Sequence, residues 1–452
     1  MSIEIKLKKG LDLHLAGGVA DLSAKAIRRI PERVAVTPDD FTGIIPKADV
    51  REGDTVKAGQ PLLHDKLDEN LKIVSPAPGK VVAVVRGNRR KIERVVIEVD
   101  NTGEAVSHDT ADAVISRENA RNLLLVSGLW AFTRQRPYDI VTRPDAEIRD
   151  IFVTGFDSAP LAVSFQRFGS DHERVQRLET GVKLLSMLTD GNVYITRRQF
   201  QHMPDIHGAE MVDITGPHPA GNAGTAIAAI NPVNKGETVM TLSVETLERI
   251  GAMVQTGIAP MTTTVALTGS EIKSPKTIET LIGAEIKTLL ADDIADDHRH
   301  HRIISGNVLT GHTVTTDGYL RFPYTQVTVI PEGDDVDEFM GWASMSPSKM
   351  SISPSFPARL FGRKQFKPDA RLLGGRRAMI MSGQYDKVFP MDILPEYLVK
   401  AVLAKDIDRM EQLGIYEVAP EDFALAEYVD TSKLELQKII REGLNYLRKE
   451  LS

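Results

Sequence analysis

Residues 50–66, VREGDTVKAGQPLLHDK, decide the fold of the first part of this 452-residue chain. Turns at Gly53-Asp54 and Ala58-Gly59 separate two short β-prone runs. A second stretch, VSPAPGKVVAVV at residues 74–85, turns through its prolines and Gly79 into a valine-rich strand. Short strands with closely spaced turns predict a small β domain, and we assign it to residues 1–100 together with the N-terminal segment.

The spacing GD-x-V-x-x-G-Q-x-L followed by SP-x-x-G-x-V resembles the barrel-sandwich of lipoyl and biotinyl carrier domains. Lys66, in Asp65-Lys66-Leu67, resembles the lysine that such carriers modify. The sequence places it beside the first strands rather than at a symmetric hairpin tip, so we expect an unmodified, structural lysine. A lipoyl- or biotinyl-type carrier modified at Lys66 is kept as an alternative.

The rest of the chain predicts a multi-domain α/β protein with four parts. Residues 101–117 are polar and form a linker. Residues 118–256 contain a strand–helix–strand pattern, which predicts parallel pairing in a Rossmann-like domain. Residues 257–332 contain a hairpin followed by a helix, as in a β-grasp module. Residues 333–452 predict a helical domain, with one helix between Pro395 and Gly414 and a second with apolar residues at steps of four and three, namely Leu436, Ile440, Leu444, Leu447 and Leu451.

The composition excludes several classes of function. Net charge is −7 at pH 7, which gives no general attraction to nucleic acid. There is no cysteine, which removes disulfides, thiolate catalysis and cysteine-ligated clusters. The N-terminus lacks the apolar core of a signal peptide, and no apolar run reaches the roughly 18 residues that span a bilayer. We therefore expect a cytoplasmic chain that is soluble when isolated.

Two stretches near the C-terminus have the spacing of iron–sulfur ligands without any cysteine. In AMIMSGQYDKVFPMDILP, residues 378–395, the positions of a C-x-x-C-x-x-C-x-x-x-C-P motif are occupied by Met379, Ser382, Tyr385 and Phe389. The same steps recur at Pro420, Phe423, Ala426 and Asp430. An emptied cluster site would cost about 24 cal/mol per Å³ of cavity, so we expect packed side chains at these positions and no metal.

The two spacings resemble the double-cluster domain of the C subunit of the Rnf complex, and the order of domains resembles the NADH-oxidising flavoprotein subunit of respiratory complex I. The cysteine-free family of that group comprises the A subunits of the sodium-translocating NADH:quinone reductases. The chain resembles this family over nearly its whole length, in runs that follow one another in the same order: KKGLDLHLAG (8–17), residues 50–66, SPAPGKV (75–81), SGLWAFTRQRP (127–137), HPAGNAGTAI (218–227), ISGNVLTGH (304–312) and VIPEG (329–333).

The resemblance implies a peripheral bacterial subunit on the cytoplasmic face of the inner membrane, whose partners are the other subunits, including the membrane subunits. The complex passes electrons from NADH through flavins to ubiquinone or menaquinone and moves sodium. Sister subunits would use the NADH and FAD or FMN. We expect this chain to carry no covalent cofactor, flavin or iron–sulfur cluster and no catalytic residue of its own.

The flavin region of the relatives has changed in this chain. The stretch that corresponds to their glycine-dense phosphate loop keeps only Gly128, with Trp130 and Phe132 where backbone would approach a phosphate. Asn222 and Ala223 stand where those relatives use acidic residues near the nicotinamide. We expect neither NADH nor FMN to bind. A stand-alone flavin- or NADH-dependent dehydrogenase is kept as the second alternative.

A quinone needs a flat apolar surface and one or two donors for its carbonyl oxygens, and residues 130–138 supply both. The candidate quinone-binding residues are Trp130, Phe132, Arg134, Arg136, Tyr138 and, from a separate turn, Phe41. A loop that packs on the carrier-like domain or docks a partner protein is the other interpretation of the same run.

One further run combines metal-ligand residue types, namely Asp292, Asp293, Asp296, Asp297, His298, His300 and His301. Carboxylate and imidazole groups are ligands of divalent ions. The run lacks the single-face spacing of a metalloenzyme helix, so we expect a solvated loop.

Overall fold

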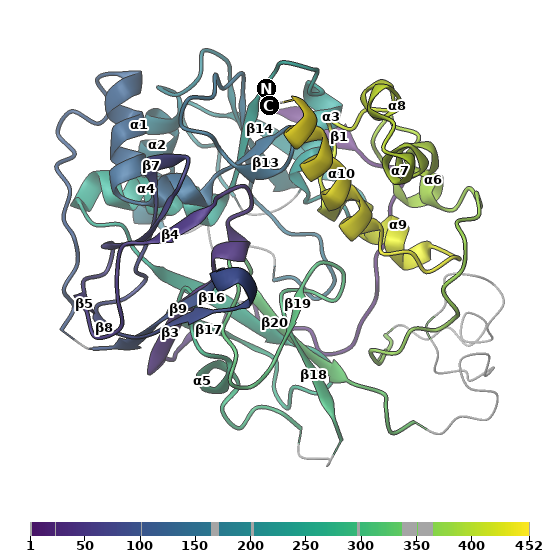
Figure 1. Cartoon of the computed structure of the whole chain (residues 1–452), viewed down its shortest axis with the longest axis horizontal. Helices are drawn as coiled ribbons and strands as arrows, with labels where there is room; N and C mark the ends of the chain where they lie inside the picture. The colour runs from purple at the N-terminus through teal and green to yellow at the C-terminus, as the bar shows by residue number, and fades with distance from the viewer. Residues whose placement is uncertain are drawn as a thin grey trace.

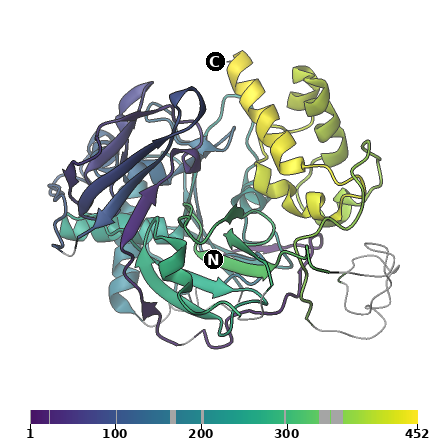
Figure 2. The same cartoon turned by 60° about the horizontal axis from the view of Figure 1, so that its bottom comes forward.

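The computed structural model describes residues 2–22, 24–100, 102–163, 171–199, 203–295, 299–336, 350 and 365–451. Three sheet-containing parts and one helical part lie around a common centre (Figure 1). Figure 2 shows the strands of the first β domain and the C-terminal helices on opposite sides of the molecule, with a green sheet below and between them.

The first β domain consists of two small antiparallel sheets, as the turn spacing predicts. One sheet has the order β3-β9-β8-β5 and the other β4-β6-β7. Valine and isoleucine side chains of β8 and β9 contribute to the core, and Val81 and Ile97 have no exposed surface. The strands are β3 (Arg33–Val36), β4 (Pro46–Ala48), β5 (Thr55–Val56), β6 (Pro61–Asp65), β7 (Asp68–Val74), β8 (Gly79–Arg86) and β9 (Ile92–Val99).

A seven-stranded sheet follows, with the order β1-β14-β13-β12-β15-β10-β11. The first five strands in this order are mutually parallel, and β10 and β11 are antiparallel additions at one edge. The parallel pairing of β12 with β13 confirms the predicted strand–helix–strand unit. The strands are β1 (Ile3–Lys6), β10 (Arg134–Arg136), β11 (Ile140–Val141), β12 (Ile151–Thr154), β13 (Val193–Arg198), β14 (Glu210–Thr215) and β15 (Val239–Ser243).

Helices cover both faces of this sheet because its strands are apolar on both sides. In β12, Ile151 and Val153 join one core with α2 (His172–Leu185) and α4 (Val244–Thr256). Phe152 points to the other face and packs with α3 (Ala223–Ile230). Helix α1 (Arg117–Val126) begins at the Ser116 N-cap and leads into the 3-10 turn η3 (Leu129–Phe132).

The third part is a six-stranded mixed sheet with the order β19-β18-β20-β16-β17-β2. Its centre is the predicted hairpin, in which β16 (Thr262–Thr268) pairs antiparallel with β17 (Lys276–Leu281), and the short helix α5 (Ile286–Leu290) follows. The remaining strands are β2 (Ile27–Arg28), β18 (His301–Ser305), β19 (His312–Val314) and β20 (Gln326–Pro331).

The C-terminal part is helical. It contains α6 (Tyr385–Val388), α7 (Pro395–Ala404), α8 (Ile407–Gln412), the 3-10 turn η7 (Pro420–Phe423), α9 (Ala424–Val429) and α10 (Leu436–Leu451). The single helix expected between Pro395 and Gly414 is wrong, because Lys405 adopts a left-handed conformation (φ 55°) and Asp406 caps a new helix. The predicted apolar face of α10 is confirmed at four of its five positions, since Leu451 is exposed.

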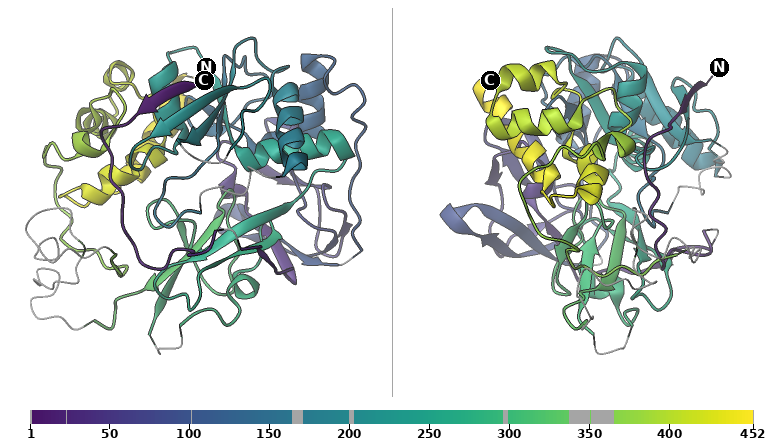
Figure 3. Two further views of the ribbon diagram at one scale, coloured as in Figure 1. Left: turned by 180° about the vertical axis from the view of Figure 1, so that it is seen from behind. Right: turned by 90° about the vertical axis from the view of Figure 1, so that its right-hand side faces the viewer.

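The N-terminal segment does not pack as part of the first β domain. Strand β1 pairs with β14 at the edge of the seven-stranded sheet, and β2 pairs with β17 in the six-stranded sheet. Figure 3 shows this purple segment running between the two sheets. No helix of the described ranges is both long and apolar enough to cross a bilayer.

Candidate functional site

The predicted quinone-contact residues divide between two places in the structure. Trp130 and Phe132 lie on η3 and pack into the core between the first β domain and the seven-stranded sheet. Trp130 is 1% exposed, and its indole N–H donates to the Thr142 carbonyl at 2.7 Å. Trp130 therefore offers neither a free ring face nor a free donor.

Phe132 and Phe41 are brought together with a third ring that sequence reasoning missed. Phe322 lies 4.5 Å from Phe132 and 5.3 Å from Phe41 between ring centroids, and it is stacked on Phe41 at an interplanar angle of 7°. These rings border a cavity of about 20 Å³, roughly the space of one water. The three parts that contain the sheets thus meet at an aromatic contact.

A buried ion pair flanks the aromatic contact. Arg321 Nε donates to Asp40 at 2.5 Å, and the Phe322 amide donates to the same carboxylate at 3.0 Å. Burial raises the pKa of Asp40, and the Arg321 partner offsets part of that rise. Arg134 donates to the Asp40 carbonyl at 3.0 Å.

Arg136 points away from this contact, toward the C-terminal helices. Its guanidinium is 2% exposed and donates to Asp422 at 2.8 Å, to Glu421 at 3.3 Å and to the Glu417 carbonyl at 3.2 Å. Burial alone would lower the pKa of Arg136, but the charges of Asp422, Asp139 and Glu421 outweigh it and raise the pKa. Arg136 is a structural tie between the seven-stranded sheet and η7.

Tyr138 also belongs to this junction. Its ring meets Tyr416 edge-on at 6.3 Å, and its carbonyl accepts a hydrogen bond from Arg441. Arg441 also pairs with Asp139. Burial alone would raise the pKa of Asp139, but Arg134, Arg441 and Arg136 lower it overall. The six predicted residues therefore do not form one pocket.

The positions with cluster-ligand spacing lie largely in one apolar core. Tyr385, Phe389, Phe423 and Ala426 are buried in the same group of side chains, and Phe389 meets Phe423 at 5.0 Å between centroids. One residue of each stretch contributes to that aromatic pair. Ordinary side chains pack against one another at these four positions. That the positions correspond to lost cluster ligands stays a prediction.

The other four positions have polar or peripheral surroundings. Asp430 has no exposed surface, and its carboxylate accepts hydrogen bonds from the Ser432 and Leu434 amides. Burial and then the charge of Asp430 raise the pKa of Tyr385. The remaining three positions, Met379, Ser382 and Pro420, are only half-buried.

The expected place of Lys66 is wrong. Asp65 and Asp68 pair at the ends of β6 and β7, so Lys66 and Leu67 form the tip of that hairpin. Lys66 is exposed. Position therefore gives no argument against modification of Lys66, and the intact mass of the chain would decide between the bare and the modified lysine.

The acidic and histidine run is partly described. Asp293 pairs with Arg29 at 2.8 Å and with Lys276 at 2.5 Å. His300 lies 2.7 Å from Asp334 and His301 lies 3.5 Å from Glu271. Asp296, Asp297 and His298 lie outside the described residues. Within the part of the chain that the structure describes, no three such residues converge as metal ligands.

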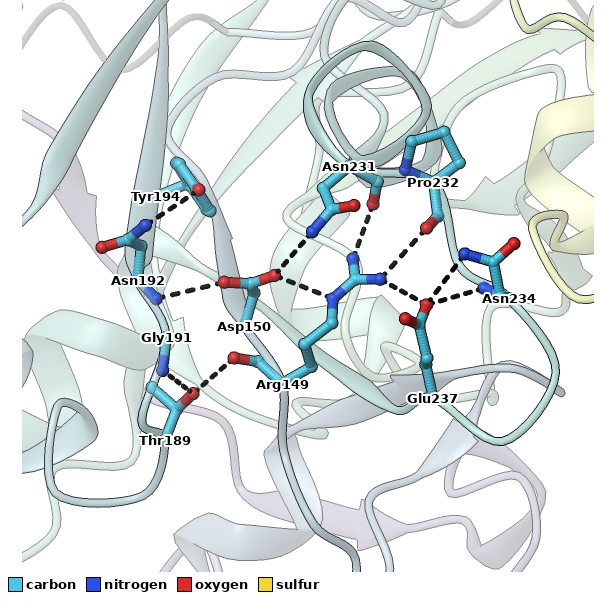
Figure 4. A network of polar contacts seen from close by, with 10 residues as sticks. All are labelled: Arg149, Asp150, Thr189, Gly191, Asn192, Tyr194, Asn231, Pro232, Asn234 and Glu237. Atoms are coloured by element: carbon cyan, nitrogen blue, oxygen red, sulfur yellow. Dashed lines mark hydrogen bonds and ion pairs between the residues drawn. The ribbon is translucent and has the colours of Figure 1, made fainter.

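A polar network closes the amino ends of β12 and β13 (Figure 4). Arg149 donates to Asp150 at 2.9 Å, to Glu237 at 2.5 Å and to the carbonyls of Asn231 and Pro232. Ligands of open α/β sheets bind at the carboxyl ends of strands, the opposite edge. We interpret the network as a brace that holds the strand starts together.

Sequence comparison defines the class of this protein. Residues 5–100 match the model of the NqrA N-terminal barrel-sandwich hybrid domain, residues 115–259 that of the NqrA second alpha/beta domain, and residues 264–316 that of the NQRA C-terminal domain. The match over residues 5–100 confirms the predicted barrel-sandwich domain. The protein is therefore a multi-domain α/β protein that contains a barrel-sandwich hybrid domain.

Full-length relatives identify the family. The chain is 36% identical to the A subunit of the Na(+)-translocating NADH-quinone reductase from Rhodopirellula baltica, with 98% of each chain covered. It is 35% identical to the Serratia proteamaculans protein of that name and 34% identical to that of Neisseria meningitidis serogroup B, covering 99% of this chain and 100% of each relative. The chain belongs to the family of the A subunits of the Na(+)-translocating NADH-quinone reductases, which are bacterial oxidoreductases.

Similarity to solved structures is weaker. The crystal structure of an NAD+-reducing [NiFe]-hydrogenase in the H2-reduced state has a TM-score of 0.37 and 12% identity, covering 75% of this chain and 61% of that chain. At this level it supports no inference about a site.

Proposed function

We propose that this chain is a cofactor-free, peripheral subunit of the sodium-translocating NADH:quinone reductase, held on the cytoplasmic face of the membrane by contacts with its sister subunits. Membership of the A-subunit family supports the assignment of this chain to the complex. The Rossmann-like and β-grasp descriptions of the second and third parts belong to the same proposal, supported by the strand orders given above.

The observation that carries an assembly role is a set of exposed apolar side chains in the C-terminal part, on the segment before α6 and at the start of α7. We call Ile380, Met381, Leu394 and Tyr397 the apolar surface; their exposed fractions are 50%, 38%, 55% and 53%. The amides of Ser382 and Gly383 both donate to the Glu396 carboxylate, at 2.9 and 2.8 Å. These bonds tie the segment that follows Met381 to the first turn of α7, where Leu394 and Tyr397 lie. Such grouping on a soluble surface marks a protein contact.

Replacing Met381 and Tyr397 together by Asp is expected to abolish incorporation of the chain into the complex. Two charges in a buried contact would each require desolvation without a partner, which few docking interfaces tolerate. Co-purification of the tagged variant with the other subunits measures the loss.

The matched control is Ile115→Asp, which places one charge at another exposed apolar position, 67% exposed. It should assemble normally. Both variants should unfold at the temperature of the unchanged chain, since neither alters the core. Normal assembly of the double variant would refute the apolar surface as the contact.

The absence of a flavin or nucleotide site is supported at the start of α3. A phosphate at this helix would need its free amides and positive end. Instead, the helical part covers it: a Cβ added at Gly224 would lie 2.6 Å from Asp422 Oδ1. The buried Asp422 carboxylate therefore lies where an anionic ligand would have to approach. Trp130 and Phe132 likewise occupy the neighbouring core in place of a glycine-rich loop.

Quinone contact is a second candidate function. Its support is the aromatic contact at which the three sheet-containing parts meet. Phe41, Phe132 and Phe322 offer flat apolar rings, but the present cavity of about 20 Å³ does not admit a quinone ring without separation of the rings. We propose that a quinone headgroup enters between Phe41 and Phe322, where the stacking is face to face.

Replacing Phe322 by Leu should weaken quinone affinity of the assembled complex several-fold while leaving NADH oxidation with artificial acceptors unchanged. Leucine retains most of the apolar volume but lacks the ring face. Trp130→Leu, which alters a ring enclosed in the core, is the control with no expected effect on quinone affinity beyond that of lowered stability. Equal quinone affinities for the unchanged and Phe322→Leu complexes would rule out this site.

A further inference from the structure

The described residues border a partly open cavity of about 350 Å³ between the seven-stranded and six-stranded sheets. It is bordered by the loop after β12, the first turns of α2 and α4, and strands β16, β17 and β20. It therefore lies beyond the carboxyl ends of the parallel strands β12 and β15, where open α/β sheets bind ligands. Its volume is within the range of small-molecule sites.

Arg249 on α4 borders this cavity and lacks the partners that a buried arginine requires. It is 8% exposed, and its one hydrogen bond within the described part of the chain runs from Nη2 to the Thr262 carbonyl at 2.6 Å. Among the described residues, its Nε atom is buried without a hydrogen-bond partner, and no acidic side chain lies within ion-pair distance. The other arginine with comparable burial, Arg136, has two carboxylate partners.

This contrast is informative because buried charges are almost always paired. The Phe132 ring, 6.0 Å from the guanidinium, compensates only part of the lost hydration. Burial lowers the pKa of Arg249, and the charges of Glu245 and Glu248 offset only part of that fall; an arginine side chain nevertheless keeps its proton. The guanidinium thus remains available to an anionic group in the cavity.

Three side chains that border the same cavity have carboxylate or amide oxygens that receive fewer hydrogen bonds than they can accept. The Asp157 carboxylate receives a hydrogen bond from the Ala159 amide at 2.7 Å, and Glu245 Oε1 has no partner. Burial raises the pKa of both groups. Gln326 is 5% exposed; its amide nitrogen donates to the Pro160 carbonyl, which fixes Oε1 as an acceptor, and Oε1 is unpartnered.

We propose that this cavity binds a small zwitterion of the amino-acid class, with its carboxylate on Arg249 and its ammonium group toward Asp157 and Glu245. Glu245 and Arg249 are four positions apart on α4, so their Cβ atoms are about 5–6 Å apart and lie on one face. An amino acid with a short separation between its charges spans that distance.

The composition of the cavity lining restricts the ligand further. The described lining contains no aromatic side chain, so the described residues offer no platform for stacking a nucleobase or a quinone ring. Threonines and charged groups dominate instead. The inference is independent of the proposed docking role, because the apolar surface lies in the C-terminal part.

Binding is tested on the purified full-length chain by calorimetry and thermal unfolding with glycine, β-alanine and γ-aminobutyrate as zwitterionic probes. Propionate and propylammonium present the anionic and the cationic group separately. The proposal expects at least one zwitterion to bind and raise the melting temperature at concentrations where neither single ion does so. Binding of propionate as tight as that of the zwitterions, or binding of none of the probes, would overturn it.

Variants separate a ligand-binding role from a structural one. Arg249→Gln and Glu245→Gln should each weaken zwitterion binding at least about tenfold, because each removes a charge-assisted contact. Arg376→Gln, on an exposed arginine far along the chain, should bind normally. Arg249→Met should abolish binding and raise the melting temperature of the ligand-free chain, because it removes an unpaired buried charge. A fall in that temperature would show that Arg249 is structural and would refute the proposal.

Discussion

Replacing Arg136 by Met is expected to destabilise the chain by about 3–5 kcal/mol, the cost of breaking a buried ion pair from one side. The substitution leaves the Asp422 carboxylate, whose side chain is 3% exposed, without its arginine. It also frees the Glu417 carbonyl and the Glu421 carboxylate. Denaturant unfolding of the purified chain, followed by circular dichroism, measures the change.

The double variant Arg136→Met with Asp422→Asn should recover part of the lost stability, because it also removes the negative charge that the loss of Arg136 leaves unpaired. An exposed arginine is the control: Arg376 pairs with Glu435 at 2.8 Å but is 68% exposed. Arg376→Met should change stability by less than about 1 kcal/mol. Equal effects of the two single substitutions would contradict the role of Arg136 as a tie between the sheet and η7.

Replacing Phe389 by Ala is expected to cost about 3–5 kcal/mol, and the loss should appear in the C-terminal helices. Phe389 is 1% exposed and contacts Phe423, which has no exposed surface. Phe389 occupies one of the positions with cluster-ligand spacing, and removal of its ring would open a cavity there. Hydrogen exchange should show faster opening of α6 and α9.

The corresponding double-mutant cycle combines Phe389→Ala with Phe423→Ala. Because the rings touch, the two losses should be non-additive by about 0.5–1.5 kcal/mol. Ile380→Ala, on the exposed apolar surface, should have little effect on stability. Additive losses would show that the two stretches do not share one core and would contradict the filled-position interpretation.

Periodicity along the chain predicted the elements whose partners are close in sequence. The β16–β17 hairpin and the apolar face of α10 follow from residue order and spacing, and the structure confirms both. The break between α7 and α8 did not follow, because it depends on the conformation of one residue, Lys405, and on a new cap at Asp406. The hairpin tip at Lys66 was missed because strand register comes from pairing across the sheet.

The candidate quinone residues show a second limit. Sequence proximity placed Trp130, Phe132 and Arg136 together, but successive residues of a turn and a strand point in different directions. Phe322, which completes the aromatic contact, lies 190 positions beyond Phe132 in the chain and had no local signal. Arg249 had a weak signal: it lies between Thr246 and Met253 on the buried face of α4, an unusual place for a charge.

By itself, the sequence determined the family, the barrel-sandwich and the absence of cysteine from the positions that have cluster-ligand spacing, because these depend on residue identity and short-range order. Only the tertiary structure decided that Arg136 pairs with carboxylates while Arg249 has no such partner among the described residues. It also decided that the predicted quinone residues divide between the aromatic contact and the junction with the C-terminal helices. Pairing and burial depend on which distant segments meet, and chain packing sets those contacts at separations that local patterns do not encode.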